Sequence, residues 1–189
     1  MSLELFLGPM FAGKSSEVLR ILQRNKVIGR KTMVITHALD TRYTEEPRIV
    51  THNQVSHPAA AVHALQSLLP SPELHAAECV IIEEAQFFPD LKDFVLNVVE
   101  AYGKHVICVG LDGDSERKPF GQLLDLVPYC DRVTKFNALC KRCGDGTEAI
   151  FTYRVPEAPK TQINVGGADQ YEPLCRRHFI KAIVGITDT

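Results

Sequence analysis

The stretch Gly8-Pro9-Met10-Phe11-Ala12-Gly13-Lys14-Ser15 matches the phosphate-loop pattern GxxxxGK[ST] at every fixed position. Before it lies the short apolar segment 3–7, typical of a buried strand, and after it apolar side chains recur at helical spacing over residues 15–28. A strand, a glycine-containing loop and a helix in this order are the context that gives the pattern meaning. The stretch therefore predicts a phosphate-binding loop, and a surface turn with an incidental lysine is the less favoured alternative.

The chemistry expected of this loop follows from its residue types. Glycines let the backbone curl so that several N–H groups point inward, and the N-terminus of the following helix adds partial positive charge. Lys14 can reach the β- and γ-phosphates of a nucleoside triphosphate, and the Ser15 hydroxyl can ligate Mg²⁺. The loop alone does not distinguish a kinase from an ATPase or a GTPase.

The chain beyond this loop alternates between expected strands and expected helices. Strands are predicted at residues 32–36, 79–82 and 106–111, and helices at residues 59–69 and 91–102. Residues 37–58 are polar, with little periodicity, and are expected to contain loop. The alternation predicts an α/β fold, in which a phosphate-loop (RecA-like) parallel sheet is flanked by helices.

Size and charge limit the possible classes of protein. The chain has 189 residues, of which 45% are hydrophobic and 23% charged, as in an ordinary globular protein. The net charge of −2 provides no overall basic field to drive nucleic-acid binding. No run is long and apolar enough to span a bilayer, and the first residues suggest a strand rather than a signal peptide. We therefore expect a cytoplasmic location and no membrane partner.

Two adjacent acidic residues, Glu83 and Glu84, follow the apolar run 79–82. Carboxylates at the carboxyl end of a buried strand lie where open α/β sheets bind their ligands. One can hold Mg²⁺, and the other can accept a proton from an attacking hydroxyl. Alternation along a strand points the two in different directions, so they should have separate roles. A solvated strand end without function is the alternative.

Four residues near the C-terminus have the spacing of metal ligands. Cys140 and Cys143 form one pair with two residues between them, and Cys175 and His178 form another. Such pairs suit a tetrahedral structural Zn²⁺, which would fix the base of the long stretch between them. The alternatives are chance pairs, with His178 an ordinary surface residue, or a basic zinc ribbon that binds nucleic acid. The overall charge argues against the ribbon.

The remaining cysteines and histidines receive simpler interpretations. Cys79, Cys108 and Cys130 are expected to be buried small hydrophobes. The other histidines, such as His37, His52 and His57, show no ligand spacing and are expected on the surface or in loops. The chain changes character after residue 135, where the metal-type pairs replace long apolar runs. We predict an ATP-binding domain at residues 1–135 and a small zinc-binding lasso domain at 136–189.

Taken together, these motifs resemble the zinc-containing, cytosolic-type (type II) thymidine kinases. They occur in the family's order over nearly the whole chain. Besides the phosphate loop and the metal pairs, they are Glu84-Ala85-Gln86-Phe87-Phe88, Gly110-Leu111-Asp112-Gly113-Asp114, Arg117-Lys118-Pro119-Phe120-Gly121, and Val165-Gly166-Gly167-Ala168-Asp169 followed by Tyr171. The chain differs from the family at Glu83, where aspartate is usual, and at Ser115, where phenylalanine is common.

The resemblance implies a reaction and a set of site residues. The reaction is transfer of the γ-phosphoryl group of ATP to the 5′-hydroxyl of thymidine, with Mg²⁺, for DNA precursor salvage. Deoxyuridine is a further expected substrate. Glu84 is implied as the general base. The residues implied to bind the nucleotide and its metal ion are Gly8, Pro9, Met10, Phe11, Ala12, Gly13, Lys14, Ser15, Glu83 and Gln86. Those implied to contact the nucleoside are Met10, Asp40, Arg42, Phe87, Leu111, Phe120, Thr152, Gln162, Ile163, Asn164, Val165, Gly166 and Tyr171.

The resemblance also implies properties that cannot be assigned to single residues. The stretch between the zinc pairs would form a lid, or lasso, over the base. The family leads us to expect a homotetramer, and thymidine triphosphate as a feedback inhibitor. A phosphate-loop ATPase that binds nucleic acid through its zinc lobe is the rival hypothesis from another functional class.

Overall fold

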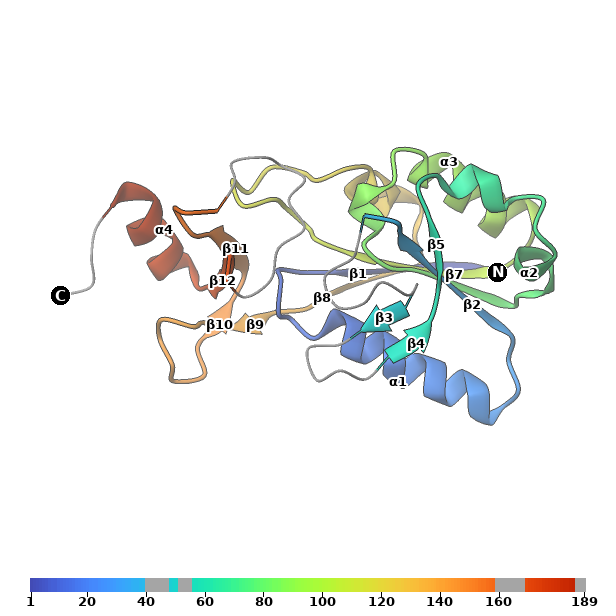
Figure 1. Cartoon of the computed structure of the whole chain (residues 1–189), viewed down its shortest axis with the longest axis horizontal. Helices are drawn as coiled ribbons and strands as arrows, with labels where there is room; N and C mark the ends of the chain where they lie inside the picture. Colours follow the sequence, from blue (N-terminus) through green and yellow to red (C-terminus); the bar gives the residue numbers. More distant parts are fainter. Residues whose placement is uncertain (40–47, 51–55, 159–168, 186–189) are drawn as a thin grey trace.

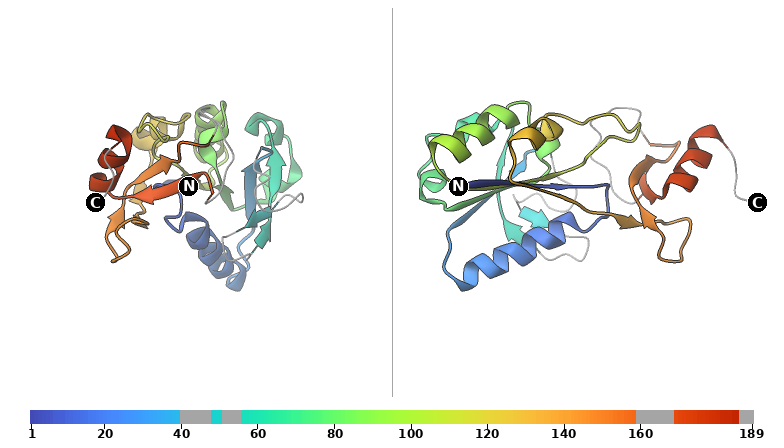
Figure 2. Two further views of the ribbon diagram at one scale, coloured as in Figure 1. Left: turned by 60° about the vertical axis from the view of Figure 1, so that its left-hand side comes forward. Right: turned by 180° about the vertical axis from the view of Figure 1, so that it is seen from behind.

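The computed structural model describes residues 1–39, 48–50, 56–158 and 169–185. The molecule is elongated, with a large sheet and its helices at one end and a small lobe at the other (Figure 1). The chain starts within the large part, and its last described helix, which spans Arg176–Val184, lies in the small lobe, as the view from behind also shows (Figure 2).

The large part is built on a six-stranded sheet in the order β5-β2-β6-β7-β1-β8. Every pairing between neighbours in this sheet is parallel. The strands are β1 (Ser2–Leu7), β2 (Thr32–His37), β5 (Ala60–Val62), β6 (Cys79–Ile82), β7 (His105–Gly110) and β8 (Arg132–Lys135). The parallel α/β sheet predicted from the alternating pattern is confirmed.

Helices cover both faces of this sheet, and each face has its own apolar core. On one face α1 (Lys14–Val27) packs Val18 and Leu22 against Phe6, Ile81 and Val109. The other face carries the short helices η1 (Leu65–Leu68), α2 (Pro72–Ala76), η2 (Ala85–Phe87) and η4 (Leu123–Tyr129), together with α3 (Leu91–Leu96) and its π-helical continuation η3 (Asn97–Ala101). Figure 1 shows α1 opposite α2 and α3, as expected for helices on two faces.

The helix predicted at residues 59–69 is wrong. Residues 60–62 form the edge strand β5, and only Leu65–Leu68 turn, as a 3₁₀ helix. The strand pairs in parallel with β2, and Ile35 lies opposite Ala60. Alanine favours helix in isolation by well under 1 kcal/mol per residue relative to most other residues. Hydrogen bonding to an open sheet edge, together with packing, outweighs that preference.

The small lobe consists of short strands and one helix. Strands β9 (Ala138–Leu139) and β10 (Glu148–Ala149) pair with each other, as do β11 (Phe151–Arg154) and β12 (Tyr171–Leu174). Helix α4 (Arg176–Val184) packs Phe179 into a separate apolar cluster with Ala138, Ala149 and Leu174. The last strand of the large sheet ends at Lys135, and the division into two domains stays a prediction.

Two other features complete the description. A short antiparallel pair, β3 (Arg48–Val50) and β4 (Ser56–Pro58), lies within the segment expected to contain loop. Across the residues that the structure describes, no helix has both the length and the apolar character needed to cross a bilayer.

Candidate functional site

The phosphate-loop stretch connects β1, which ends at Leu7, to α1, which begins at Lys14. Gly8 is needed because a Cβ atom there would overlap the backbone oxygen of Phe136. Gly13 caps the helix with a φ of 80°, a left-handed conformation that L side chains rarely adopt. The strand, loop and helix that the sequence predicted are therefore present, and the two glycines have steric reasons to be there.

Lys14 folds back over this loop. Its ammonium group donates hydrogen bonds to the backbone oxygens of Gly8, at 3.0 Å, and Pro9, at 2.8 Å. These contacts hold a positive charge at the start of α1, where the helix dipole and the first backbone N–H groups also favour an anion. The lysine, the loop and the helix end thus share one region of positive potential.

The acidic pair and the phosphate loop both lie at the carboxyl ends of strands in the parallel sheet. Glu83 directly follows β6 and is only 5% exposed. Glu84 follows it with a φ of 51° and begins the 3₁₀ turn η2. Strand β7 lies between β6 and β1, all three run parallel, and so the segments that follow β6 and β1 emerge on one side. This is the crevice position in which open α/β sheets bind ligands.

Gln86 joins the ends of two strands beside this pair. Its Nε2 atom donates to Glu84 Oε2 at 2.6 Å, and its Oε1 atom accepts from the Leu111 backbone N–H at 3.1 Å. Glu84 follows β6 and Leu111 follows β7, so one buried amide links the two segments.

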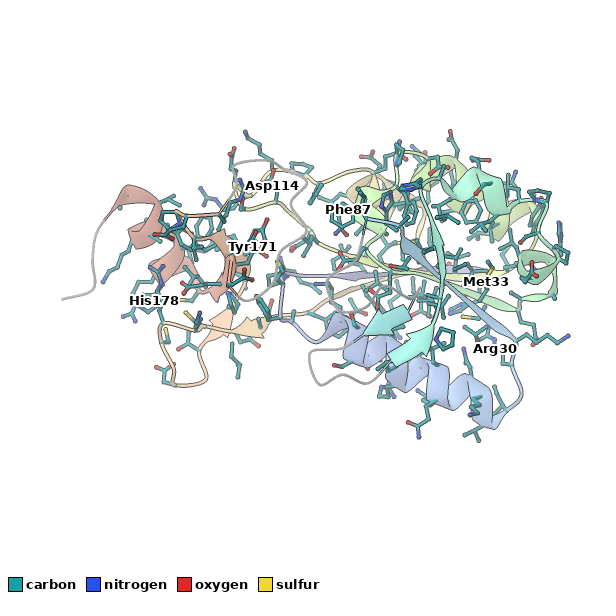
Figure 3. The ribbon with its side chains drawn as sticks, in the orientation of Figure 1. Arg30, Met33, Phe87, Asp114, Tyr171 and His178 are labelled. Atoms are coloured by element: carbon teal, nitrogen blue, oxygen red, sulfur yellow. The ribbon has the colours of Figure 1, made fainter. Side chains whose placement is uncertain are left out.

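The structure brings some of the predicted nucleoside contacts together. The Phe87 and Phe120 rings pack edge to face with centroids 5.5 Å apart. The Met10 backbone N–H donates to Thr152 Oγ1 at 3.0 Å, which joins the phosphate loop to β11. Tyr171 is buried in the small lobe, whereas Phe87 lies in the large part (Figure 3). The other predicted nucleoside contacts lie outside the described residues: Asp40, Arg42, Gln162, Ile163, Asn164, Val165 and Gly166.

The prediction that His37 lies on the surface or in a loop is wrong. His37 is the last residue of β2 and only 5% exposed. Its ring lies 4.8 Å from that of Phe88 and 5.8 Å from that of Phe87, centroid to centroid. The signal was available, since His37 ends an apolar strand next to the strand that precedes the acidic pair.

The four predicted metal ligands converge in the small lobe. The ligand atoms of Cys140, Cys143, Cys175 and His178 all lie within 4.8 Å of one another. His178 Nδ1 lies 3.3–3.5 Å from each of the three sulfur atoms, and the Cys143 and Cys175 sulfurs are 3.8 Å apart. A tetrahedron with zinc–sulfur bonds of about 2.3 Å has edges of about 3.8 Å. The arrangement therefore fits a four-coordinate zinc ion.

The electrostatics of the cluster also suit a metal. Burial raises the pKa of the Cys140 thiol, but backbone hydrogen bonds from Cys175 and Cys143, together with the His178 side chain, outweigh it and bring the pKa to about 6. Arg177 points a guanidinium nitrogen at Cys143 Sγ, 3.9 Å away. Burial and the neighbouring Cys140 and Cys175 side chains, by contrast, raise the pKa of Cys143. Metal binding requires the thiolate form, which the lowered pKa of Cys140 favours.

Three sets of contacts attach this lobe to the large part. Phe11 and Ala12, at the tip of the phosphate loop, pack against the apolar cluster that contains Cys140, Cys175 and Phe179. Thr152 accepts the hydrogen bond from Met10 described above. The loop after β7 extends toward the lobe in Figures 1 and 2, and its Arg117 guanidinium lies 5.1 Å from the centre of the Phe179 ring.

These features define a class, namely an α/β protein with a phosphate loop, an acidic pair at the same sheet edge, and a three-cysteine, one-histidine lobe packed on that loop. The model of a protein family described as "Thymidine kinase" matches residues 1–179. The chain belongs to the thymidine kinase family, and it is an enzyme of the kinase class. The resemblance drawn from the motifs is thus confirmed.

The sequences of individual relatives match this chain over most of their lengths. "Thymidine kinase a" of Arabidopsis thaliana is 40% identical over 182 residues, which are 95% of this chain and 75% of the relative. "Thymidine kinase, cytosolic" of Homo sapiens is 37% identical over 183 residues, 97% of this chain and 75% of the relative. "Thymidine kinase" of Rabbit fibroma virus (strain Kasza) is 34% identical over 177 residues, 94% of this chain and 95% of the relative.

Proposed function

We propose that this enzyme transfers the γ-phosphoryl group of ATP to the 5′-hydroxyl of thymidine, and of deoxyuridine, giving thymidine monophosphate for DNA precursor salvage. One observation carries the proposal: the phosphate loop after β1 and the acidic pair after β6 lie at one edge of a parallel sheet in a member of the thymidine kinase family. A positive cradle and a carboxylate base on the same edge are what phosphoryl transfer to a hydroxyl requires.

The residues divide the work by their positions. The loop amides and Lys14 bind the ATP phosphates, and Ser15 and Glu83 hold Mg²⁺. Glu84 lies at the surface of the crevice and accepts the proton from the 5′-hydroxyl. The magnesium ion, when bound, neutralises charge on the transferred phosphoryl group. Of the residues proposed to contact the nucleoside, the structure describes Met10, Phe87, Leu111, Phe120, Thr152 and Tyr171.

The cysteine-rich lobe holds a structural zinc ion in this proposal. Four protein ligands fill a tetrahedron, so no coordination position is left for water or substrate. The ion would stabilise a lobe whose own apolar core is small and whose strands are short. Zinc therefore contributes to the reaction by fixing the elements that surround the nucleoside.

The rival nucleic-acid function has little support in this lobe. Lys141 and Arg142, between the first two cysteines, both form ion pairs with Glu172, at 3.2 Å and 3.1 Å. Charges neutralised in this way contribute little to the binding of a phosphate backbone.

A cytoplasmic location, a homotetramer and feedback inhibition by thymidine triphosphate complete the proposal. They rest on the family, in which the Homo sapiens relative is among those named as cytosolic.

A nucleoside panel tests the proposed function. Zinc-loaded protein is assayed with ATP and Mg²⁺ against thymidine, deoxyuridine, deoxycytidine and uridine, and nucleoside monophosphate is measured directly. Turnover of thymidine and deoxyuridine above the other two is expected. ATP hydrolysis that is stimulated by DNA, without phosphorylation of any nucleoside, would overturn the proposal in favour of the rival function.

A further inference from the structure

The geometry around Gln86 points to a role that differs from nucleotide binding. We propose that Gln86 is a positioning residue, which holds the Glu84 carboxylate in the orientation needed to accept a proton. The inference rests on the proposed role of Glu84 as the base. It replaces the expectation from the family resemblance that Gln86 contacts the nucleotide or its metal ion.

Both ends of the Gln86 amide are engaged by groups that fix its direction. A carboxylate accepts hydrogen bonds and a backbone N–H donates them, so Glu84 must face the NH₂ group and Leu111 must face the oxygen. A flipped amide would lose both bonds. The donor is therefore presented to Glu84 in one orientation, at 2.6 Å. A hydrogen bond to an ionised acceptor is stronger and more directional than a neutral one.

Gln86 itself is held by close backbone contacts. Its side chain and backbone are 2% exposed. A Cβ atom at Gly110 would overlap Gln86 Oε1, and one at Gly121 would overlap the Gln86 backbone oxygen. Glycine at these two positions lets the strand end and the loop close on the glutamine from two sides. A side chain packed in this way is confined to one rotamer, so it can hold a neighbouring group in place.

Glu84 needs such support because its backbone is unusual. Its φ of 51° and ψ of 40° lie in the left-handed region, where a residue with a Cβ atom pays in strain. That conformation turns the chain from the end of β6 into η2. The side chain has several rotatable bonds, and the hydrogen bond from Gln86 restricts them. The carboxylate is thereby preorganised for the reaction.

Two substitutions separate the two hydrogen bonds. Gln86→Glu keeps an acceptor for the Leu111 N–H but places a second carboxyl group against Glu84. The two carboxyl groups then share a proton, so Glu84 is less able to accept one from the substrate. Gln86→Met keeps the length and loses both bonds. We expect each variant to lower kcat by about 10- to 100-fold, the scale of a misplaced catalytic group, while KM for ATP changes by less than about threefold.

A double-mutant cycle tests whether Gln86 acts through Glu84. Gln86→Met is measured alone and in the Glu84→Gln background. If Gln86 only positions the base, its loss should cost less than about twofold once the base is gone. An equal loss of kcat in both backgrounds would overturn the inference, as would a higher KM for ATP with unchanged kcat, since that result would place Gln86 on the nucleotide.

Asn25→Leu is the matched control for lost stability. Asn25 is also a buried amide, 7% exposed, and it donates to Thr32 Oγ1 at 3.0 Å far from the sheet edge that carries Glu84. Its substitution should lower the melting temperature and leave kcat unchanged. Equal loss of kcat in this control would assign the Gln86 effect to general destabilisation. Failure of the wild-type enzyme to phosphorylate thymidine would instead reject the proposed function.

Discussion

At the scale of single residues, Glu83 and Glu84 show how neighbours in sequence acquire different environments. Glu83 directly follows a strand that is buried on both faces, and it is itself buried. Glu84 leaves the strand in a left-handed conformation and is partly exposed. The sequence predicted separate roles from strand alternation. The structure adds that the change of direction occurs in the backbone, at Glu84 itself.

Glu84→Gln is expected to lower kcat by about 10²- to 10⁴-fold, the usual contribution of a general base. The amide keeps the size of the side chain but cannot accept the proton. KM for ATP and thymidine should change little, because the loop and the base pocket are untouched. Steady-state kinetics with both substrates measure the effect. Turnover equal to that of the wild type would remove Glu84 from the role of base.

Thr152→Val is expected to weaken binding of both substrates, because the hydroxyl that accepts the Met10 N–H is lost. The partly buried N–H group would then lack this acceptor, which should lower local stability. Thr152→Ser retains the hydroxyl and is the control. Isothermal titration of a non-hydrolysable ATP analogue and of thymidine separates the two affinities. Equal affinities in the wild type and Thr152→Val would contradict the prediction.

At the scale of elements, the sequence predicted the central strands well and the edge poorly. The apolar runs at residues 79–82 and 106–111 can only be buried, and their positions in β6 and β7 follow. The alanine-rich segment 59–69 carries no such information, because alanine favours a helix in isolation and yet residues 60–62 form an edge strand. Pairing with β2 decides between them, and that partner is distant in the sequence.

Strand β7 begins with His105, whose side chain makes the stability of the fold depend on pH. Burial lowers the pKa of His105 below its ordinary value of 6.5, although the nearby Glu4 opposes the shift. The unfolded chain therefore binds a proton more readily than the folded one. Stability contributed by neutral His105 is fully present above about pH 6.5 and is lost as the pH falls from there through the lower pKa of the folded state.

Urea unfolding at pH 7.5 and pH 5.5 checks this dependence. The free energy of unfolding should be lower at pH 5.5, and His105→Gln should reduce the difference between the two pH values. Glutamine keeps a polar group of similar size that does not titrate. An unchanged difference in the variant would show that other groups cause the pH dependence.

At the scale of the whole molecule, the small lobe is attached to the phosphate loop rather than merely adjacent to the sheet. Phe11 and Ala12 belong to the loop and yet pack with the apolar cluster of the lobe. The sequence predicted the loop and the four ligands separately. It could not predict their contact, because a single aromatic side chain carries no sign of which distant surface will cover it. All of the predicted nucleoside contacts remain predictions.

Removal of zinc should therefore affect ATP as well as thymidine. With the metal chelated, Cys140, Cys143 and Cys175 are expected to become reactive toward a thiol reagent. Cys79, whose pKa burial raises to about 11, and Cys108, whose pKa burial raises further, should stay protected. Spectrophotometric thiol counting and ATP titration, before and after chelation, measure both effects. Exposure of the ligand thiols without any loss of ATP affinity would contradict the coupling.

The left-handed backbone of Glu84 has a consequence for the evolution of the enzyme. Glycine tolerates such a conformation, whereas a residue with a side chain loses about 1 kcal/mol there. A library of variants selected only for resistance to heat should therefore accept glycine at this position, and the survivors would lack the proposed base. The wild-type residue persists under selection for turnover, so this site records a compromise between durability and activity.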